Sequence, residues 1–242
     1  MSGAPVPTID ELLALPAGET YKADARSTVW RVDAPVGSYV LKRYEYAALR
    51  QRLGLWLGLH PGQRERRGLR RLRRAGIPAV PVERWAVRRG KYVQATAHGG
   101  ACLQDLLPEM QASAENANDR REAISAEVAE VAAVAAKLLA AGLVHRDLKL
   151  GNVLVHAEDG EGGDKNGGRV VLIDVGAVRR SRSKRRRRAT LGMLFHTLGK
   201  ASRSPADADR DTGALARSLV AAGVERSLLP RAAQESVDSG HE

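Results

Sequence analysis

The chain has 242 residues, which is enough for one two-lobed domain with a sizeable core. Its 43% content of hydrophobic residues excludes general disorder, and it contains no apolar run long enough to cross a membrane as a helix. The net charge of +11 favours anionic partners, which include nucleotides, phosphorylated sugars, nucleic acid and acidic lipid head groups, but charge does not choose among them.

The first 19 residues hold Pro, Gly and a short apolar patch, and we expect them to form a lead-in segment before the folded domain. They lack the basic start and the continuous apolar stretch of a signal peptide. The single cysteine, Cys102, cannot form an internal disulfide, which fits a reducing compartment. We therefore expect a cytoplasmic protein.

A β-meander is predicted after the lead-in. Residues 28–32 alternate between apolar and polar side chains, residues 34–37 form a turn, and residues 38–44 are typical of the next strand. A helix is then predicted over residues 62–75, where leucines form a one-sided apolar face among many arginines. The Gly-Ile-Pro sequence at residues 76–78 ends this helix.

Two more strands are predicted at residues 80–87 and 91–96, and a His-Gly-Gly connector follows them. Beyond the connector the pattern becomes mainly helical. Apolar residues at helical spacing predict helices at residues 103–107, 119–141, 191–198 and 213–222. The second half of the chain is therefore expected to be a helical lobe.

A small hairpin interrupts the helical half. Apolar runs at residues 153–155 and 170–173 flank a polar, glycine-rich segment at residues 157–168, which predicts an enlarged loop. The order of elements predicts an α+β, protein-kinase-like fold with a β-rich N-lobe and a reduced helical C-lobe. The expected divisions are a lead-in at 1–19, the N-lobe at 20–97, the C-lobe at 98–235 and a disordered tail at 236–242.

The strongest functional signal is the segment GLVHRDLKLGNVLV at residues 142–155. Phosphoryl transfer from ATP requires an oriented hydroxyl, neutralised phosphates and fixed metal ions rather than covalent chemistry. Asp147 can accept the proton of an attacking hydroxyl, and Lys149 can offset charge on the transferring phosphoryl group. Asn152 can bind Mg²⁺ through its amide oxygen. The alternative is a satisfied polar cluster in a kinase-like protein that has lost activity.

Two further pieces complete a nucleotide site. Asp174 ends an apolar strand 22 positions after Asn152, where it can serve as a second magnesium ligand. Lys42 lies on an otherwise apolar strand, where an unpaired ammonium would be costly to bury. Glu65, one of very few acids nearby, is its expected partner, and the pair would position the α- and β-phosphates. The alternatives are a solvent-facing lysine and an ordinary surface acid.

These motifs resemble those of the protein-kinase superfamily over residues 21–180. Within it the chain is most similar to the small bacterial lipopolysaccharide kinases, which phosphorylate Kdo or heptose. The similarity rests on Lys22 with RSTV at 26–29, YVLKRY at 39–44, Glu65 with Leu72 and GIP at 76–78, and the Arg-rich segment after Asp174. The resemblance implies ATP and Mg²⁺ as cofactors, with Lys42 and Glu65 at the nucleotide, Asp147 as base, and Asn152 and Asp174 as metal ligands.

The sequence departs from the kinase pattern in three ways. No G-x-G-x-x-G loop precedes Lys42, so the turn at residues 22–28, with Ser27 and Thr28, must cover the phosphates instead. Val175 replaces the usual Phe after the second metal ligand. Only 68 residues follow that ligand, and they contain no A-P-E segment for docking an extended peptide. A sugar or glycolipid acceptor is therefore favoured over a protein.

The basic run RRSRSKRRRR at residues 179–188 lies where kinases carry an activation segment. It would form an electrostatic platform for an anionic acceptor, such as a phosphorylated core sugar, or else a solvated basic loop. The platform predicts peripheral contact with an acidic surface at the inner face of the cytoplasmic membrane. Two rival functions stay open: a minimal protein serine/threonine kinase, and a basic nucleic-acid-binding module on a kinase scaffold. The lack of interleaved aromatics counts against base stacking.

Overall fold

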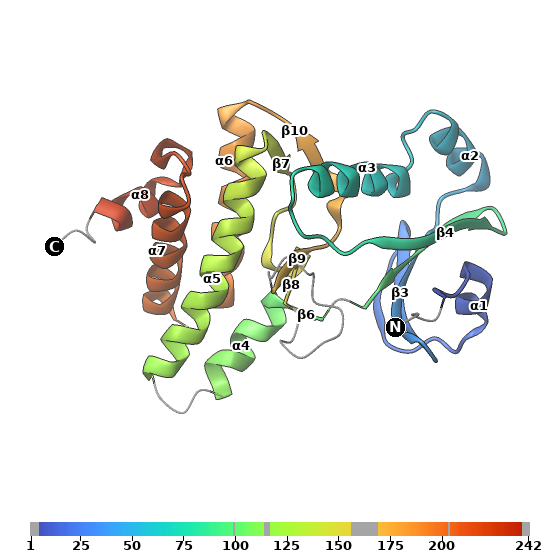
Figure 1. Ribbon diagram of the computed structural model, residues 1–242, viewed down its shortest axis with the longest axis horizontal. Coiled ribbons are helices and arrows are strands. Elements are labelled where there is room, and N and C mark those ends of the chain that lie inside the picture. Colours follow the sequence, from blue (N-terminus) through green and yellow to red (C-terminus); the bar gives the residue numbers. More distant parts are fainter. Residues whose placement is uncertain (1–4, 99, 114–116, 156–168, 203, 239–242) are drawn as a thin grey trace.

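A sheet-rich N-terminal part and a helical C-terminal part make up the molecule, as Figure 1 shows. This computed structural model describes residues 5–98, 100–113, 117–155, 169–202 and 204–238. The α+β class predicted from the sequence is confirmed by this layout. Within the described residues, no helix is both long enough and apolar enough to cross a membrane.

Five antiparallel strands form the N-terminal sheet in the order β1-β2-β3-β5-β4. Their bounds are β1 Thr20–Ala23, β2 Ser27–Ala34, β3 Gly37–Tyr44, β4 Val82–Arg88 and β5 Lys91–Ala97. Arg89 and Gly90 join β4 to β5, and their φ angles of 47° and 71° suit the two-residue turn of a twisted hairpin. Alternation along β2 and β3 brings Trp30, Val32 and Leu41 to one buried face. The predicted meander is therefore confirmed.

A short helix, α1 (Ile9–Ala14), packs against that buried face. Thr8 begins the helix with a capping box, because its side chain accepts a hydrogen bond from the Glu11 backbone while the Glu11 side chain accepts one from the Thr8 backbone. Ile9 and Leu12 are buried in the same cluster as the strands. The segment expected to be a lead-in thus contributes to the N-terminal core, which the sequence did not indicate.

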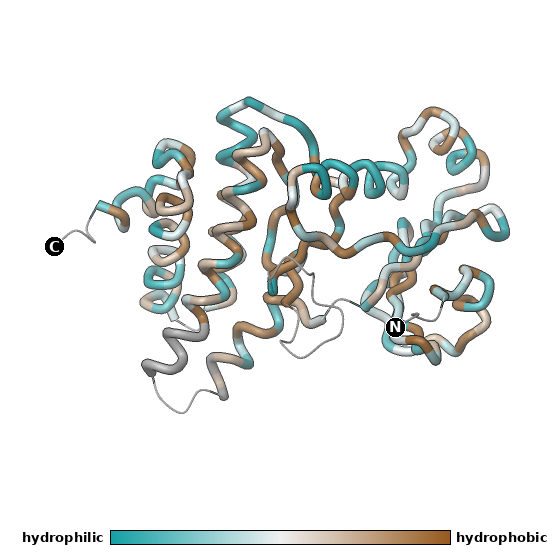
Figure 2. Tube along the Cα trace, in the orientation of Figure 1, coloured by the Kyte–Doolittle hydropathy of each residue, from teal (hydrophilic) through white to brown (hydrophobic). Residues whose placement is uncertain are grey.

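Two helices link β3 to β4. They are α2 (Ala48–Trp56), which was not predicted, and α3 (Pro61–Arg74), which the sequence predicts at residues 62–75. The residues that α3 buries follow a spacing of three to four and are Gly62, Glu65, Gly68 and Leu72. Figure 2 shows α3 as hydrophilic along most of its length, so its apolar contact with the rest of the fold is narrow.

The remaining elements form the C-terminal part. Their bounds are β6 Ala101–Cys102, α4 Leu103–Ser113, α5 Ala117–Ala140, β7 Leu143–His145, η1 Leu150–Asn152, β8 Val153–Val155, β9 Val170–Leu172, η2 Val175–Ala177, β10 Val178–Arg180, α6 Lys184–Ala201, α7 Pro205–Ala221, η3 Arg226–Leu228 and α8 Arg231–Asp238. The four predicted helices correspond to α4, α5, α6 and α7. Helices α5, α6 and α7 lie side by side (Figure 1) and share an aliphatic core that includes Leu138, Leu194 and Leu215.

Two small antiparallel sheets carry the segments of the predicted functional motif. Strands β6, β8 and β9 form one sheet, and β7 pairs with β10 in the other. The predicted hairpin is confirmed as β8 and β9, and its loop at residues 157–168 lies outside the described residues. Helix α8 extends to Asp238, so residues 236–238 are helical and not part of a disordered tail. The rest of that tail, residues 239–242, also lies outside the described residues.

Candidate active site

A cleft of about 770 Å³ lies between the N-terminal sheet and the small sheets of the C-terminal part. Residues from both parts line it, including Lys22, Ser27, Val29, Lys42, Asn152, Ile173 and Asp174. Both predicted metal ligands and the predicted phosphate-pairing lysine therefore border the same space. A cavity of this volume is large enough for a nucleotide-sized ligand.

Lys42 on β3 links the two parts by electrostatic contacts. Its Nζ lies 3.3 Å from Glu65 Oε2 on α3 and 3.0 Å from Asp174 Oδ1 after β9. Burial acts to lower the pKa of Lys42, but the two carboxylates outweigh burial and raise the pKa above its ordinary value. The ammonium is therefore charged at neutral pH. The ion pair with Glu65 that the sequence predicts is present, and its role at the phosphates stays a prediction.

Glu65 is buried, with 7% of its surface exposed, and it has a second donor. The Tyr44 hydroxyl donates to Glu65 Oε2 at 3.0 Å. Burial, followed by the charge of Glu65, raises the pKa of the Tyr44 phenol, so the phenol stays protonated and can donate. Sequence reasoning missed Tyr44. The signal that could have found it is its spacing of two residues from Lys42, which places both side chains on one face of a strand.

The backbone of Asp174 is left-handed, with φ of 49° and ψ of 42°. Asp tolerates this conformation better than most residues. This left-handed residue turns the chain from β9 into η2. Burial acts to raise the pKa of Asp174, but the charge and hydrogen bond of Lys42 prevail and hold the pKa below its ordinary value. Asp174 is therefore a carboxylate at neutral pH.

The loop from β7 to η1 brings the three catalytic-motif residues together. Asn152 Nδ2 donates to the Asp147 carbonyl at 2.8 Å and to Asp147 Oδ2 at 3.1 Å. Lys149 Nζ lies 3.2 Å from the same Oδ2. The Asp147 backbone N–H donates to Nδ1 of His145 at 3.2 Å, and burial lowers the pKa of that histidine. A neutral, buried His145 thus orients the Asp147 backbone, while its neighbours orient the carboxylate.

Mg²⁺ fits the oxygen atoms that this arrangement directs at the cleft. Because Asn152 Nδ2 is bonded to Asp147, the amide Oδ1 is the atom left to bind a cation, and Asp174 supplies a carboxylate. Mg²⁺ usually takes one or two protein carboxylates, with waters and substrate phosphates completing its shell. Among the residues that the structure describes, no group of three or more His, Cys, Asp or Glu could hold a metal by itself. The metal roles of Asn152 and Asp174 stay predictions.

The turn between β1 and β2 stands in place of a glycine-rich loop. Asp24 fixes it, since its Oδ1 accepts 2.8 Å hydrogen bonds from the backbone N–H groups of Arg26 and Ser27, and these bonds lower the pKa of Asp24 to about 2. Ser27 lines the cleft. Thr28 does not, because it lies on the other face of β2 and donates its hydroxyl to Glu45 Oε1 at 2.9 Å. The prediction that both hydroxyls cover the phosphates is corrected for Thr28.

The basic run at residues 179–188 is not a continuous loop, because β10 and α6 take up its two ends. Two of its arginines bind carbonyl groups of the fold. Arg187 donates to the Leu139 carbonyl at 3.2 Å, near the end of α5, and Arg188 donates to the Ser227 carbonyl at 2.7 Å. Cations are favourable at a helix C-terminus, so Arg187 stabilises α5. Only part of the run therefore remains to meet a ligand.

Comparisons with known proteins show which family and which solved structures the chain is similar to. A model of the lipopolysaccharide kinase (Kdo/WaaP) family matches residues 16–217. The solved structure of WaaP in complex with acyl carrier protein is similar, with a TM-score of 0.57 and 18% identity over 88% of this chain and 81% of that one. The BubR1 kinase domain also matches, with a TM-score of 0.45 and 16% identity over 67% and 46% of the two chains. No curated protein sequence matches. The likeness to WaaP confirms the predicted kinase-type fold.

Proposed function

The chain belongs to the lipopolysaccharide kinase (Kdo/WaaP) family of ATP-dependent phosphotransferases, and we propose that it phosphorylates a hydroxyl of a core sugar, Kdo or heptose. The observation that carries this proposal is the convergence of Lys42, Glu65 and Asp174 at one cleft that also contains Asn152. Such a convergence supplies the positioned charges that phosphoryl transfer from ATP requires.

Each residue has a proposed role in this reaction. Lys42, held by Glu65, binds the α- and β-phosphates of ATP. Asn152 and Asp174 hold Mg²⁺, which when bound neutralises charge on the β- and γ-phosphates. The Ser27 side of the β1–β2 turn covers the phosphates from the sheet.

Asp147 is the proposed base, and Lys149 is its proposed helper. Both Asn152 Nδ2 and Lys149 Nζ contact Asp147 Oδ2. Oδ1 has no hydrogen-bond partner among the residues that the structure describes, so it can accept the proton of the sugar hydroxyl. The hydroxyl oxygen attacks the γ-phosphorus, and the bond between that phosphorus and the leaving ADP oxygen breaks. Lys149 lies beside Asp147 and therefore beside the reacting hydroxyl, where its ammonium can offset the negative charge of the transferring phosphoryl group.

The acceptor is proposed to be anionic and lipid-linked. The strongly basic charge of the chain favours phosphorylated sugars over neutral ones. To reach a lipid-linked acceptor, the enzyme would act at the inner face of the cytoplasmic membrane, in peripheral contact with acidic lipid. The similar WaaP was solved with an acyl carrier protein, so a carrier protein belongs among the partners to be tested.

Transfer of labelled phosphate from ATP tests the proposal. Purified Kdo- and heptose-containing glycolipids, a generic protein substrate and RNA are offered as separate acceptors, each with the unchanged protein and with Asp147→Asn. We expect label in the glycolipid, and a rate at least about a hundredfold lower in the variant, because a general base is lost. Label in protein alone would favour the minimal protein kinase, and RNA retention without ATP turnover would favour the nucleic-acid module.

A further inference from the structure

Helix α2 exposes an apolar stripe. Leu49, Leu53, Trp56 and Leu57 lie on one side of the helix, with exposed fractions of 71%, 49%, 82% and 55%. The opposite side is anchored, because the buried Gln51 donates through Nε2 to a backbone carbonyl of β3 at 2.7 Å. The direction in which the stripe points is therefore fixed by the fold. A contiguous stripe of large apolar residues at the surface marks an interaction site.

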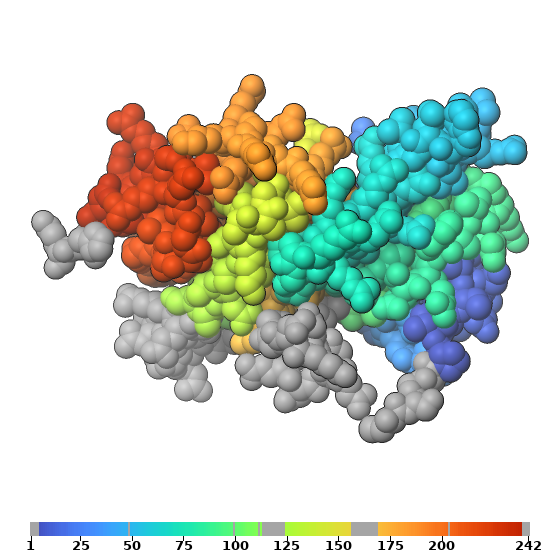
Figure 3. Space-filling model, turned by 45° about the horizontal axis from the view of Figure 1, so that its top comes forward, coloured from blue at the N-terminus to red at the C-terminus, as the bar shows by residue number. Residues whose placement is uncertain are grey.

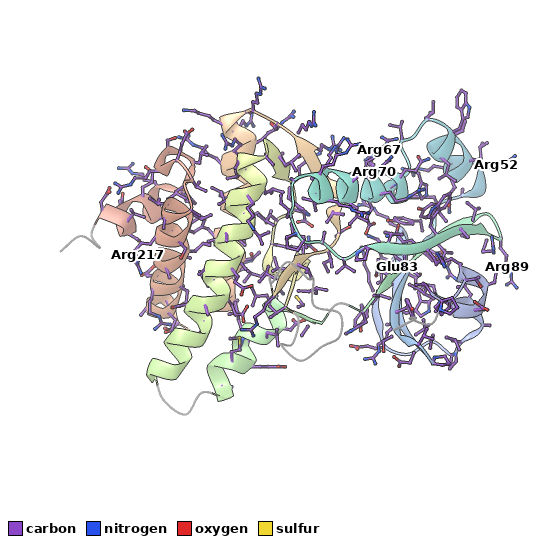
Figure 4. The ribbon with its side chains drawn as sticks, in the orientation of Figure 1. Arg52, Arg67, Arg70, Glu83, Arg89 and Arg217 are labelled. Carbon is purple, nitrogen blue, oxygen red and sulfur yellow. The ribbon has the colours of Figure 1, made fainter. Side chains whose placement is uncertain are left out.

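Arginines lie beside this stripe. Arg52 belongs to α2, and α3 exposes Arg64, Arg67 and Arg70 at a spacing of three residues. Figure 4 shows Arg67 and Arg70 together on α3, and Arg52 farther to the right on α2. The sole acidic residue of these two helices is Glu65, which is buried beneath α3. The surface is therefore strongly positive without an internal counter-charge.

The same face continues to the catalytic loop. Figure 3 shows α2, α3 and the start of α6 on one side of the molecule. Arg71 ties α3 to β10 by donating to the Val178 carbonyl at 2.7 Å. Strand β10 carries two exposed arginines and pairs with β7, which ends two residues before Asp147. We call the surface made by α2, the outer side of α3 and residues 179–186 the docking face.

We propose that the docking face binds a bilayer containing anionic phospholipid, with Trp56 and the neighbouring leucines inserted at the level of the head groups. Arginines around an apolar stripe are complementary to anionic head groups around acyl chains. Trp suits this depth because its ring is apolar and its N–H is polar. The position of Asp147 beside this face would bring a lipid-linked sugar to the cleft. The delivery of the sugar to the cleft rests on the proposed function, whereas the binding of the docking face to a bilayer does not.

An acidic protein, such as acyl carrier protein, is the alternative occupant. Protein interfaces usually place an aromatic or aliphatic anchor in an apolar pocket. The hollow of about 130 Å³ on this face is lined by polar and charged residues, namely Gln63, Arg66, Arg67 and Arg70. An apolar side chain of a protein partner would therefore find no apolar surface to pack against in it. The apolar groups of the docking face project outward instead, which suits a soft lipid surface.

Vesicle flotation tests the proposal without ATP or an acceptor, so its result is independent of the kinase assay. The full chain is mixed with vesicles of phosphatidylcholine alone or with added phosphatidylglycerol. We expect binding to the anionic vesicles that weakens as salt rises, and little binding to the neutral ones. Replacing Arg64 and Arg70 with Gln should weaken binding about 25-fold, at about fivefold per arginine. Trp56→Ser should weaken it about tenfold.

Matched controls come from other faces. Arg217→Gln on α7, at the opposite end of the molecule in Figure 4, and Val36→Ser at the β2–β3 turn should bind like the unchanged protein. Acyl-chain bromination should quench more fluorescence in the unchanged protein than in Trp56→Ser. Equal binding to both vesicle types, or unchanged binding by the Arg64/Arg70 and Trp56 variants, would overturn the proposal. Capture of acyl carrier protein by these residues, without vesicle binding, would replace the lipid by an acidic protein.

Discussion

The Tyr44 hydroxyl donates to Glu65 Oε2, the same oxygen that Lys42 Nζ contacts. Both donors lie on β3 and the acceptor lies on α3, so the two contacts together fix the helix against the sheet. The neutral phenol leaves the charge of the Lys42–Glu65 pair unchanged. Tyr44 is therefore a positioning residue, which acts on the nucleotide site through Glu65.

Tyr44→Phe should raise the KM for ATP and lower the free energy of unfolding by about 2 kcal/mol, because a buried carboxylate loses a hydrogen bond. Steady-state kinetics and urea unfolding measure the two effects. Tyr46→Phe is the matched control, since the Tyr46 ring stacks 6.4 Å from that of Tyr44 and its hydroxyl has no assigned role. An unchanged KM and unfolding energy in Tyr44→Phe would remove Tyr44 from the site.

Ser27 and Thr28 follow the turn between β1 and β2, and we expect their hydroxyls to have different roles. Ser27→Ala removes a hydroxyl from the cleft and should raise the KM for ATP. Thr28→Val removes a hydrogen bond to Glu45, so it should leave that KM unchanged and lower the free energy of unfolding by about 1 kcal/mol. Kinetics and denaturation on the same preparations distinguish them. Loss of ATP affinity in Thr28→Val alone would contradict the observed side-chain directions.

Helix α3 passes so close to η2 that Gly68 has no room for a side chain, because a Cβ there would lie 2.0 Å from Val175 O. Gly68→Ala should push α3 away from the segment that follows Asp174 and lower the kinase rate by about tenfold or more. Gly192→Ala in α6 is the control, since a Cβ there meets nothing within 4 Å. It should be neutral or stabilise by up to about 1 kcal/mol. Full activity in Gly68→Ala would argue against the close approach.

His60 makes stability depend on pH below neutrality. It is the buried N-cap of α3, where its Nδ1 accepts a hydrogen bond from the Gly62 N–H, and burial lowers its pKa from 6.5 to about 4. The unfolded chain therefore takes up a proton at a higher pH than the folded protein does. This contribution to stability is present above pH 6.5 and is lost as the pH falls toward 4.

His60→Asn keeps a capping side chain but cannot titrate in this range. Between pH 7 and pH 5 the unchanged protein should lose more unfolding free energy than the variant, by about 2 kcal/mol. Urea unfolding at the two pH values measures the difference, and the packing cost of the substitution cancels because it is present at both. Equal pH dependence in the two proteins would show that His60 is not the titrating group.

The catalytic loop could be predicted from the sequence because Asp147, Lys149 and Asn152 lie within six positions, so local chain geometry brings them together. The partner of Lys42 could be predicted because an ammonium on an apolar strand demands a counter-charge, and Glu65 is the acid in reach. The alternation along a strand also assigns Ser27 and Thr28 to opposite faces of β2, so only one of the two hydroxyls can face the cleft.

Other features depend on contacts between segments far apart in the chain. Helix α1 is held by packing against strands that follow it, and six residues carry too little periodicity to reveal it. Helix α2 has an apolar stripe that faces outward, so no core confirms its pattern. The carbonyl partners of Arg187 and Arg188 come from α5 and η3, and no local signal separates these arginines from their neighbours in the run.

Uptake of ATP with Mg²⁺ into the cleft is the central claim, and calorimetric titration of ATP measures it most directly. We predict that the unchanged protein binds ATP more tightly when Mg²⁺ is present, and that Asp174→Asn loses this metal-dependent increase in affinity while keeping its fold. Absence of ATP binding by the folded protein in the presence of Mg²⁺, or an undiminished metal-dependent gain in Asp174→Asn, would contradict it.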